Sequence, residues 1–155
     1  MKSIEYELCN ILIQNNLKIA TAESCTGGMI ASRITNVPGA SACFDCGVVT
    51  YSNGQKTKLL GVSPKTLETF GAVSEETALE MCDGVKKLAN ADVGISVTGI
   101  AGPDGGTLEK PVGTVWIGVC TQNTHKAFKF LFEGNREEVR EQTAVMALAL
   151  AEKYL

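Results

Sequence analysis

The sequence predicts an α/β fold, namely a three-layer α/β/α sandwich built on a mixed, mostly parallel sheet. Short apolar runs of strand length alternate with helical stretches along the first hundred residues, as in a parallel sheet that helices cover on both faces. Two later strand-like runs, separated by Gln122-Asn123-Thr124, predict an antiparallel hairpin. The length of 155 residues, with 45% hydrophobic and 20% charged residues, indicates a single domain over residues 1–155.

The first half of the chain is expected to form four helices and two strands. Ile4, Leu8 and Leu12 recur at helical spacing. Ser63-Pro64 combines a helix cap with a proline at the first helical position. The expected helices cover residues 3–14, 26–36, 59–61 and 65–70, and the expected strands cover 17–21 and 47–52.

The second half begins with a helix that Ser74-Glu75-Glu76 opens, because acids in the first turn suit the positive end of the helix dipole. Residues 93–98 are an apolar run too short for a helix, which predicts a buried strand. The loop over 99–113 is longer than most connections in a compact domain, and such loops are often functional. Strands over 114–121 and 126–132 and a long helix from Arg136 complete the prediction.

The charge balance excludes two classes of partner. The formal net charge is −3, whereas a protein that binds nucleic acid or an anionic membrane needs a basic face. No run approaches the ~18 apolar residues of a membrane span, and the N-terminal residues carry two acids among apolar ones. We therefore expect a cytoplasmic protein without an export signal.

The six cysteines indicate reduced, partly buried thiols rather than a disulfide framework. Cys43 and Cys46 form a CxxC pair, but the pair leads into a strand instead of opening a helix, which disfavours thioredoxin-like chemistry. A zinc site needs further ligands at matching spacing, and His125 is the only histidine. We expect surface thiols without function at this pair, and neither a metal nor another cofactor.

Polar residues follow three of the predicted strands, at the edge where α/β sheets bind ligands. Ser24 follows the first strand, residues 51–56 follow the second, and Thr98-Gly99 with the long loop follow the third. Two of these residues have an ordinary alternative: Ser24 as a helix cap, and Lys56 as a solvated surface lysine. Their convergence on one edge favours a site.

A serine hydrolase mechanism with a lysine base fits these residues. The only histidine lies in the predicted hairpin turn, so a Ser-His-Asp triad is improbable, but a lysine acts as base if burial lowers its pKa. Ser24 is then the nucleophile, Lys56 the base, and N–H groups of Thr26, Gly27 and Gly28 the oxyanion donors. Arg136 and Arg140 either bind a phosphate or pair with neighbouring glutamates.

Five motifs resemble the CinA C-terminal domain family over nearly the whole chain and in the family's order. The motifs are Thr21-Ala22-Glu23-Ser24-Cys25-Thr26-Gly27-Gly28, Val37-Pro38-Gly39-Ala40-Ser41, Tyr51-Ser52-Asn53-Gly54-Gln55-Lys56, Gly71-Ala72-Val73-Ser74 and Val97-Thr98-Gly99-Ile100-Ala101-Gly102-Pro103.

The resemblance implies the activity of the family's enzymatic members, the nicotinamide-nucleotide amidases of the PncC type. These hydrolyse the carboxamide of nicotinamide mononucleotide to nicotinate mononucleotide and ammonia in pyridine nucleotide salvage, without a cofactor. By position, Ser24 is similar to the nucleophile, Lys56 to the base, and Tyr51 and Thr98 to residues that order the site. Either Arg136 or Arg140 is similar to a substrate-anchoring arginine. Length makes the chain similar to the stand-alone form.

Two other functions remain open from the sequence. The same strand ends and loop suit a nucleotide-binding module without chemistry, and the pocket also suits an amidase for another small amide. A small nucleotide is the expected ligand. Apolar stripes on the terminal helices indicate a homo-oligomer, a dimer or higher.

Overall fold

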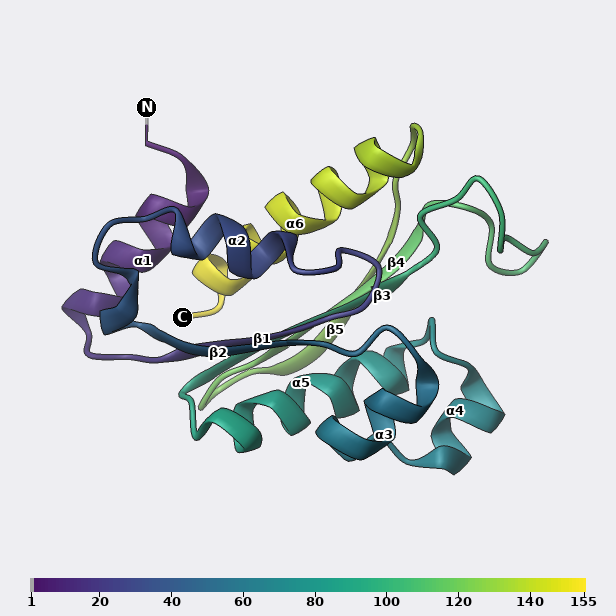
Figure 1. Cartoon of the computed structure of the whole chain (residues 1–155), viewed down its shortest axis with the longest axis horizontal. Helices are drawn as coiled ribbons and strands as arrows, with labels where there is room; N and C mark the ends of the chain where they lie inside the picture. The colour runs from purple at the N-terminus through teal and green to yellow at the C-terminus, as the bar shows by residue number, and fades with distance from the viewer. Residues whose placement is uncertain (1) are drawn as a thin grey trace.

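An open five-stranded sheet forms the middle layer of the molecule, with helices on both faces (Figure 1). The computed structural model describes residues 2–155. The strand order is β2-β1-β3-β4-β5. The strands are β1 (Ile19–Glu23), β2 (Phe44–Val49), β3 (Val93–Gly99), β4 (Thr114–Cys120) and β5 (His125–Leu131). The predicted α/β sandwich with a mixed sheet is confirmed.

The sheet divides into a parallel and an antiparallel half. β1 pairs in parallel with β2 and with β3, whereas β3 pairs antiparallel with β4, and β4 with β5. Helical crossovers join the parallel strands, and the predicted hairpin joins the last two. The carboxyl ends of β1, β2 and β3 therefore meet at one edge, which is the arrangement that the site prediction requires.

Helices from the two ends of the chain cover one face of the sheet, and helices from its middle cover the other. In Figure 1, α1, α2 and α6 lie above the sheet, and α3, α4 and α5 lie below it. Their bounds are α1 (Ile4–Gln14), α2 (Met29–Thr35), α3 (Asn53–Leu60), α4 (Pro64–Phe70), α5 (Glu75–Ala89) and α6 (Arg136–Lys153), with a 3-10 turn at Ala40–Ala42.

Several element boundaries differ from the prediction; the first strand, for example, covers Ile19–Glu23 instead of 17–21. The polar residues before Leu59 are helical, because Ser52 caps them by accepting from the N–H of Gln55. β2 begins at Phe44, so Cys46 lies inside the strand. α2 begins only at Met29, since Gly27 and Gly28 hold the preceding turn in a left-handed conformation.

The larger hydrophobic core lies between the sheet and the α1, α2 and α6 layer, with Leu8, Ile30 and Leu148 fully buried in it. A smaller cluster around Met81 and Val85 packs α5 against β1. Five of the six cysteines are buried thiols, and the sixth, Cys46, is half-buried. The expectation of surface thiols was thus wrong for Cys43, which packs in the larger core. In the part of the chain that is described, none of the helices is long and apolar enough to cross a membrane.

Candidate active site

Ser24 lies directly after β1, in a turn that the neighbouring strand holds. Its N–H donates to the carbonyl of Val97 at 3.1 Å, which extends the β1–β3 ladder by one residue. Its own carbonyl accepts from Gly27 N–H at 3.1 Å, and this closes the turn. The residue is 8% exposed. Ser24 is therefore a fixed hydroxyl at the carboxyl edge of the sheet.

Glu23, the last residue of β1, caps the helix that follows the turn. Its buried carboxylate accepts from the hydroxyl of Thr26 and from the N–H groups of Ile30 at 2.9 Å and Ala31 at 3.1 Å. A carboxylate suits this place because the first N–H groups of a helix are unpaired and carry the positive end of its dipole. The cap thus joins strand, serine turn and α2 into one rigid unit.

Lys56, in the first turn of α3, reaches the serine through the core. Its Nζ lies 3.0 Å from Ser24 Oγ, 2.7 Å from the carbonyl oxygen of Thr50 and 3.4 Å from that of Tyr51. The side chain is only 1% exposed, and no carboxylate pairs with it among residues 2–155. Burial lowers the pKa of Lys56 from its ordinary value of 10.5, because desolvation disfavours the charged form.

The three contacts of Lys56 suit both protonation states of its amine. A charged ammonium donates to all three oxygens, whereas a neutral amine donates to the two carbonyls and keeps its lone pair for the hydroxyl of Ser24. Burial favours the neutral state, whose lone pair is free to accept a proton. The neighbouring Cys25 does not compete as a nucleophile, because burial raises the pKa of its thiol to about 12 and keeps it protonated.

Ser24 and Lys56 form part of an open cleft of about 280 Å³. The sequence-based candidates Tyr51, Thr98, Gly99 and Arg136 also line it. Sequence reasoning missed the rest of the lining, which is Cys25, Asn53, Ala72, Val73, Ile100, Ala101, Gly102, Asp104 and Gly105. Several of these belong to motifs that the sequence analysis noted, and that membership was the available signal.

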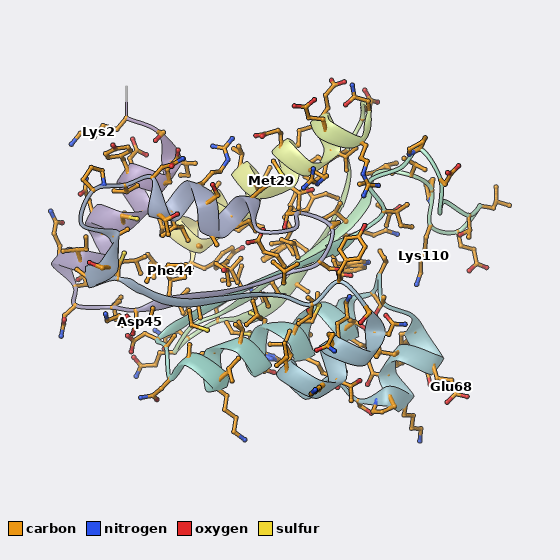
Figure 2. The ribbon with its side chains drawn as sticks, in the orientation of Figure 1. Lys2, Met29, Phe44, Asp45, Glu68 and Lys110 are labelled. Carbon is orange, nitrogen blue, oxygen red and sulfur yellow. The ribbon has the colours of Figure 1, made fainter. Side chains whose placement is uncertain are left out.

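Thr98 and Lys110 connect the cleft to the α4 side of the molecule. The hydroxyl of Thr98 donates to the carbonyl of Ala72 at 2.8 Å, so the turn before α5 is tied to the end of β3. Lys110, in the long loop, donates to the carbonyl of Phe70 at 2.7 Å. Figure 2 shows its side chain extending from the loop towards α4. These bonds hold two walls of the cleft in place.

The two arginines of α6 have different surroundings. Arg136 donates to the carbonyl of Gly102 at 2.8 Å and to the hydroxyl of Tyr51 at 3.1 Å, at the mouth of the cleft. Arg140 donates instead to the carbonyls of Cys25 at 3.0 Å and Thr26 at 3.1 Å. Arg140 thus holds the serine turn in place, and Arg136 is the one of the two arginines that lines the cleft.

The predicted oxyanion donors differ from the arrangement in the structure. Gly27 N–H is used within the turn, and Gly27 and Gly28 line a separate hollow beside α2. Thr26 is buried against Glu23. None of these three residues lines the cleft, and the Glu23 carboxylate takes the N–H groups of Ile30 and Ala31 at the start of α2.

The backbone N–H of Gly99 is a donor on the side of β3 where Ser24 lies. The carbonyl of Val97 accepts from Ser24 on the β1 side, and the N–H of Ile100 donates to Thr114 on the β4 side. Because backbone groups alternate in direction along a strand, the N–H of Gly99 points to the β1 side, beyond the end of β1. Only glycine fits there, since a Cβ would lie 2.7 Å from Val115 Cγ2 and 3.0 Å from a backbone oxygen.

An α/β domain with a serine–lysine pair at the carboxyl edge of a mixed sheet is the class of protein that fold and site define. The chain belongs to the CinA C-terminal domain family, because the sequence model of that family matches residues 1–155. It is 49% identical over 154 residues to a protein of Acetivibrio thermocellus and 52% identical over 153 residues to one of Clostridium tetani. Both relatives are named as competence-damage inducible proteins, and 99% of this chain matches 37% of each.

Two solved structures with the same fold match this chain over most of their own length. A competence-damaged protein (CinA) superfamily protein from Escherichia coli has a TM-score of 0.95 at 37% identity, covering 98% of this chain and 88% of that one. A competence/damage inducible protein from Agrobacterium tumefaciens has a TM-score of 0.88 at 40% identity, covering 99% and 96%.

Proposed function

We propose that the domain hydrolyses the carboxamide of nicotinamide mononucleotide to nicotinate mononucleotide and ammonia, with Ser24 as nucleophile and Lys56 as base. The observation that carries the proposal is the 3.0 Å contact between Lys56 Nζ and Ser24 Oγ, made by a lysine that is buried without a carboxylate partner in residues 2–155. A charged lysine at this place is costly, so the neutral form that a base requires is favoured.

The first half of the reaction transfers the acyl group to the enzyme. Neutral Lys56 takes the proton of the Ser24 hydroxyl while Oγ bonds to the carboxamide carbon. The N–H of Gly99 stabilises the resulting oxyanion, because it points to the open side of the strand end. The carbon–nitrogen bond then breaks, and Lys56 returns the proton to the nitrogen. Ammonia departs, and the acyl group stays bound to Ser24 as an ester.

The second half releases the product. Lys56, neutral again, takes a proton from water as the water oxygen bonds to the ester carbon. The ester bond to Ser24 breaks, Ser24 regains its proton from Lys56, and a carboxylic acid leaves and ionises. One water is consumed and one ammonia is produced in each turnover, and no redox step takes place.

The charges at the cleft favour a nucleotide with a pyridinium ring as the substrate, rather than an uncharged amide. Arg136 at the mouth suits a phosphate, and Asp104 in the same lining suits the positive charge of the ring. The restricted volume of about 280 Å³ suits the carboxamide end of the ligand, with the remainder lying across the open side.

Product analysis tests the proposed substrate. Purified protein is incubated separately with nicotinamide mononucleotide, nicotinamide riboside and nicotinamide, and acid and ammonia are both quantified. We expect equal amounts of nicotinate mononucleotide and ammonia from the first, and much slower turnover of the other two because they lack the phosphate. Faster turnover of nicotinamide, or of an unrelated small amide, would contradict the assignment of the nucleotide.

A further inference from the structure

Three side chains with metal-binding atoms meet at the end of the sheet opposite to Ser24. Asp83 comes from α5, Cys120 ends β4, and His125 begins β5. The hairpin between β4 and β5 lies at the lower left of Figure 1, whereas the long loop beside the cleft projects to the right. Cys120 pairs with Gly94 near the start of β3, five residues or roughly 17 Å of strand from Gly99.

The fold brings these residues together through register and packing. Cys120 and His125 are directly paired across the β4–β5 hairpin, so their side chains lie on the same face of the sheet. α5 packs on both strands of this hairpin and supplies Asp83. The three ligands thus belong to three different elements whose positions the core fixes.

The separations fit a tetrahedral cation site. One ligand atom from each residue lies within 4.8 Å of the other two. Asp83 Oδ1 is 3.3 Å from Cys120 Sγ, and Asp83 Oδ2 is 2.7 Å from His125 Nε2. Tetrahedral zinc, with bonds of about 2.0 to 2.3 Å, places its ligand atoms about 3.3 to 3.6 Å apart. Small side-chain movements are enough to admit the ion.

The cluster combines a buried thiol with two half-exposed side chains that an ion can reach from solvent. Cys120 is 2% exposed, whereas the side chains of Asp83 and His125 are 55% and 54% exposed. An ion therefore enters from solvent, and water completes its coordination on the open side. Cys82, whose Sγ donates to the carbonyl of Gly94 at 3.0 Å, is not among the three clustered residues.

We propose that Asp83, Cys120 and His125 form a binding site for one thiophilic divalent cation, with Zn²⁺ as the best match. One thiolate, one imidazole and one carboxylate are a soft to borderline ligand set, which Zn²⁺ uses in proteins and which Mg²⁺ and Ca²⁺ do not. A bound ion joins α5 to the β4–β5 hairpin. The proposal is independent of the amidase reaction, because the cluster shares no residue with the cleft.

Cobalt tests the proposal with a signal that depends on the ligands. The full chain, freed of metal by a chelator, is titrated with Co²⁺, and sulfur-to-cobalt charge transfer is recorded in the near ultraviolet. We expect saturation at one equivalent. Zn²⁺ added in excess then removes the signal as it displaces Co²⁺. Absence of the charge-transfer band at several equivalents of Co²⁺ would overturn the site.

Variants identify the ligands. Cys120→Ser is expected to abolish the charge-transfer band. His125→Gln and Asp83→Asn, which alter half-exposed side chains and so spare the fold, are expected to weaken Zn²⁺ binding at least tenfold in competition with a chromophoric chelator. The matched control Cys46→Ser removes the half-buried thiol outside the cluster and leaves both signals unchanged. A band lost in Cys46→Ser, or His125→Gln with wild-type affinity, would refute the assignment.

Discussion

Lys56 is a buried cationic residue type in surroundings that favour its neutral form. Its amine contacts two carbonyl oxygens and one hydroxyl. Burial lowers its pKa from 10.5, so the unfolded chain binds a proton more strongly than the folded chain does. Between the folded pKa and the unfolded value, stability therefore rises with pH. Below the folded pKa the full cost of a buried charge is present.

Replacement of Lys56 by methionine separates this cost from the fold. Methionine has a similar length and no charge, so we expect Lys56→Met to be at least as stable as the wild type near neutral pH. The advantage of the variant should shrink as pH rises towards about 10.4, the ordinary pKa of lysine, because above that pH the wild-type lysine is mostly neutral in both states. Urea unfolding of both proteins from pH 6 to 10 measures this. An advantage that stays constant with pH would contradict the lowered pKa.

Arg136 is expected to govern substrate binding rather than the chemical step. Loss of one charge-assisted contact costs about 1.5 to 3 kcal/mol, so Arg136→Gln should raise KM for nicotinamide mononucleotide about tenfold or more, with a smaller change in kcat. Steady-state kinetics with the nucleotide and with nicotinamide riboside provide the comparison. Arg33→Gln, which changes an arginine outside the cleft, is the control. An equal loss with the riboside would contradict a phosphate contact.

At the scale of elements, the β1–turn–α2 unit determines where the nucleophile lies. Glu23 caps α2, Arg140 binds the turn from α6, and the β3 carbonyl of Val97 holds Ser24. Each contact involves a different element, so the position of the serine depends on how α2, α6 and β3 pack around the turn.

We expect the Glu23 cap to contribute to the stability of the fold. Glu23→Gln keeps the shape but places an amide NH₂ group near backbone donors, so we expect a loss of about 2 kcal/mol and a fall in Tm of about 5 °C. Thermal unfolding and ammonia release are measured on the same sample. Glu68→Gln, on the surface of α4, is the control. An unchanged Tm for Glu23→Gln would show that the cap contributes little.

Local patterns predicted most elements and the serine–lysine pair, because strand ends converge by a general rule of parallel sheets. They did not predict the role of Glu23, since nothing in the sequence shows which donors a buried carboxylate will meet. The cluster of Asp83, Cys120 and His125 also escaped prediction. Its members come together only through hairpin register and helix packing, which sequence spacing does not encode.

At the scale of the whole molecule, the chain matches 37% of the length of each of the two relatives described above, and 88% and 96% of the two solved structures. The described residues contain two separate hydrophobic clusters and one continuous sheet. The cleft lies at the carboxyl ends of β1, β2 and β3, and the proposed cation site lies at the opposite end of the sheet. Residues from both helical layers line the cleft, among them Lys56 of α3 and Arg136 of α6.

Ligand binding should stabilise the entire domain. In the Ser24→Ala variant, which binds without turnover, nicotinamide mononucleotide at one hundred times its Kd is expected to add about 2.7 kcal/mol, a rise in Tm of roughly 5 to 10 °C. Differential scanning fluorimetry measures the shift, and adenosine monophosphate serves as the control ligand. Equal shifts from both nucleotides would indicate unspecific phosphate binding instead.

Ammonia release from nicotinamide mononucleotide by the wild type, Ser24→Ala and Lys56→Met is the most direct test of the serine–lysine mechanism. We predict steady release by the wild type and a loss of at least about a thousandfold in either variant, because both residues act in the same proton transfer. Undiminished release by either variant would contradict the mechanism. Silence from all three proteins, with the ligand still raising Tm, would identify a nucleotide-binding module.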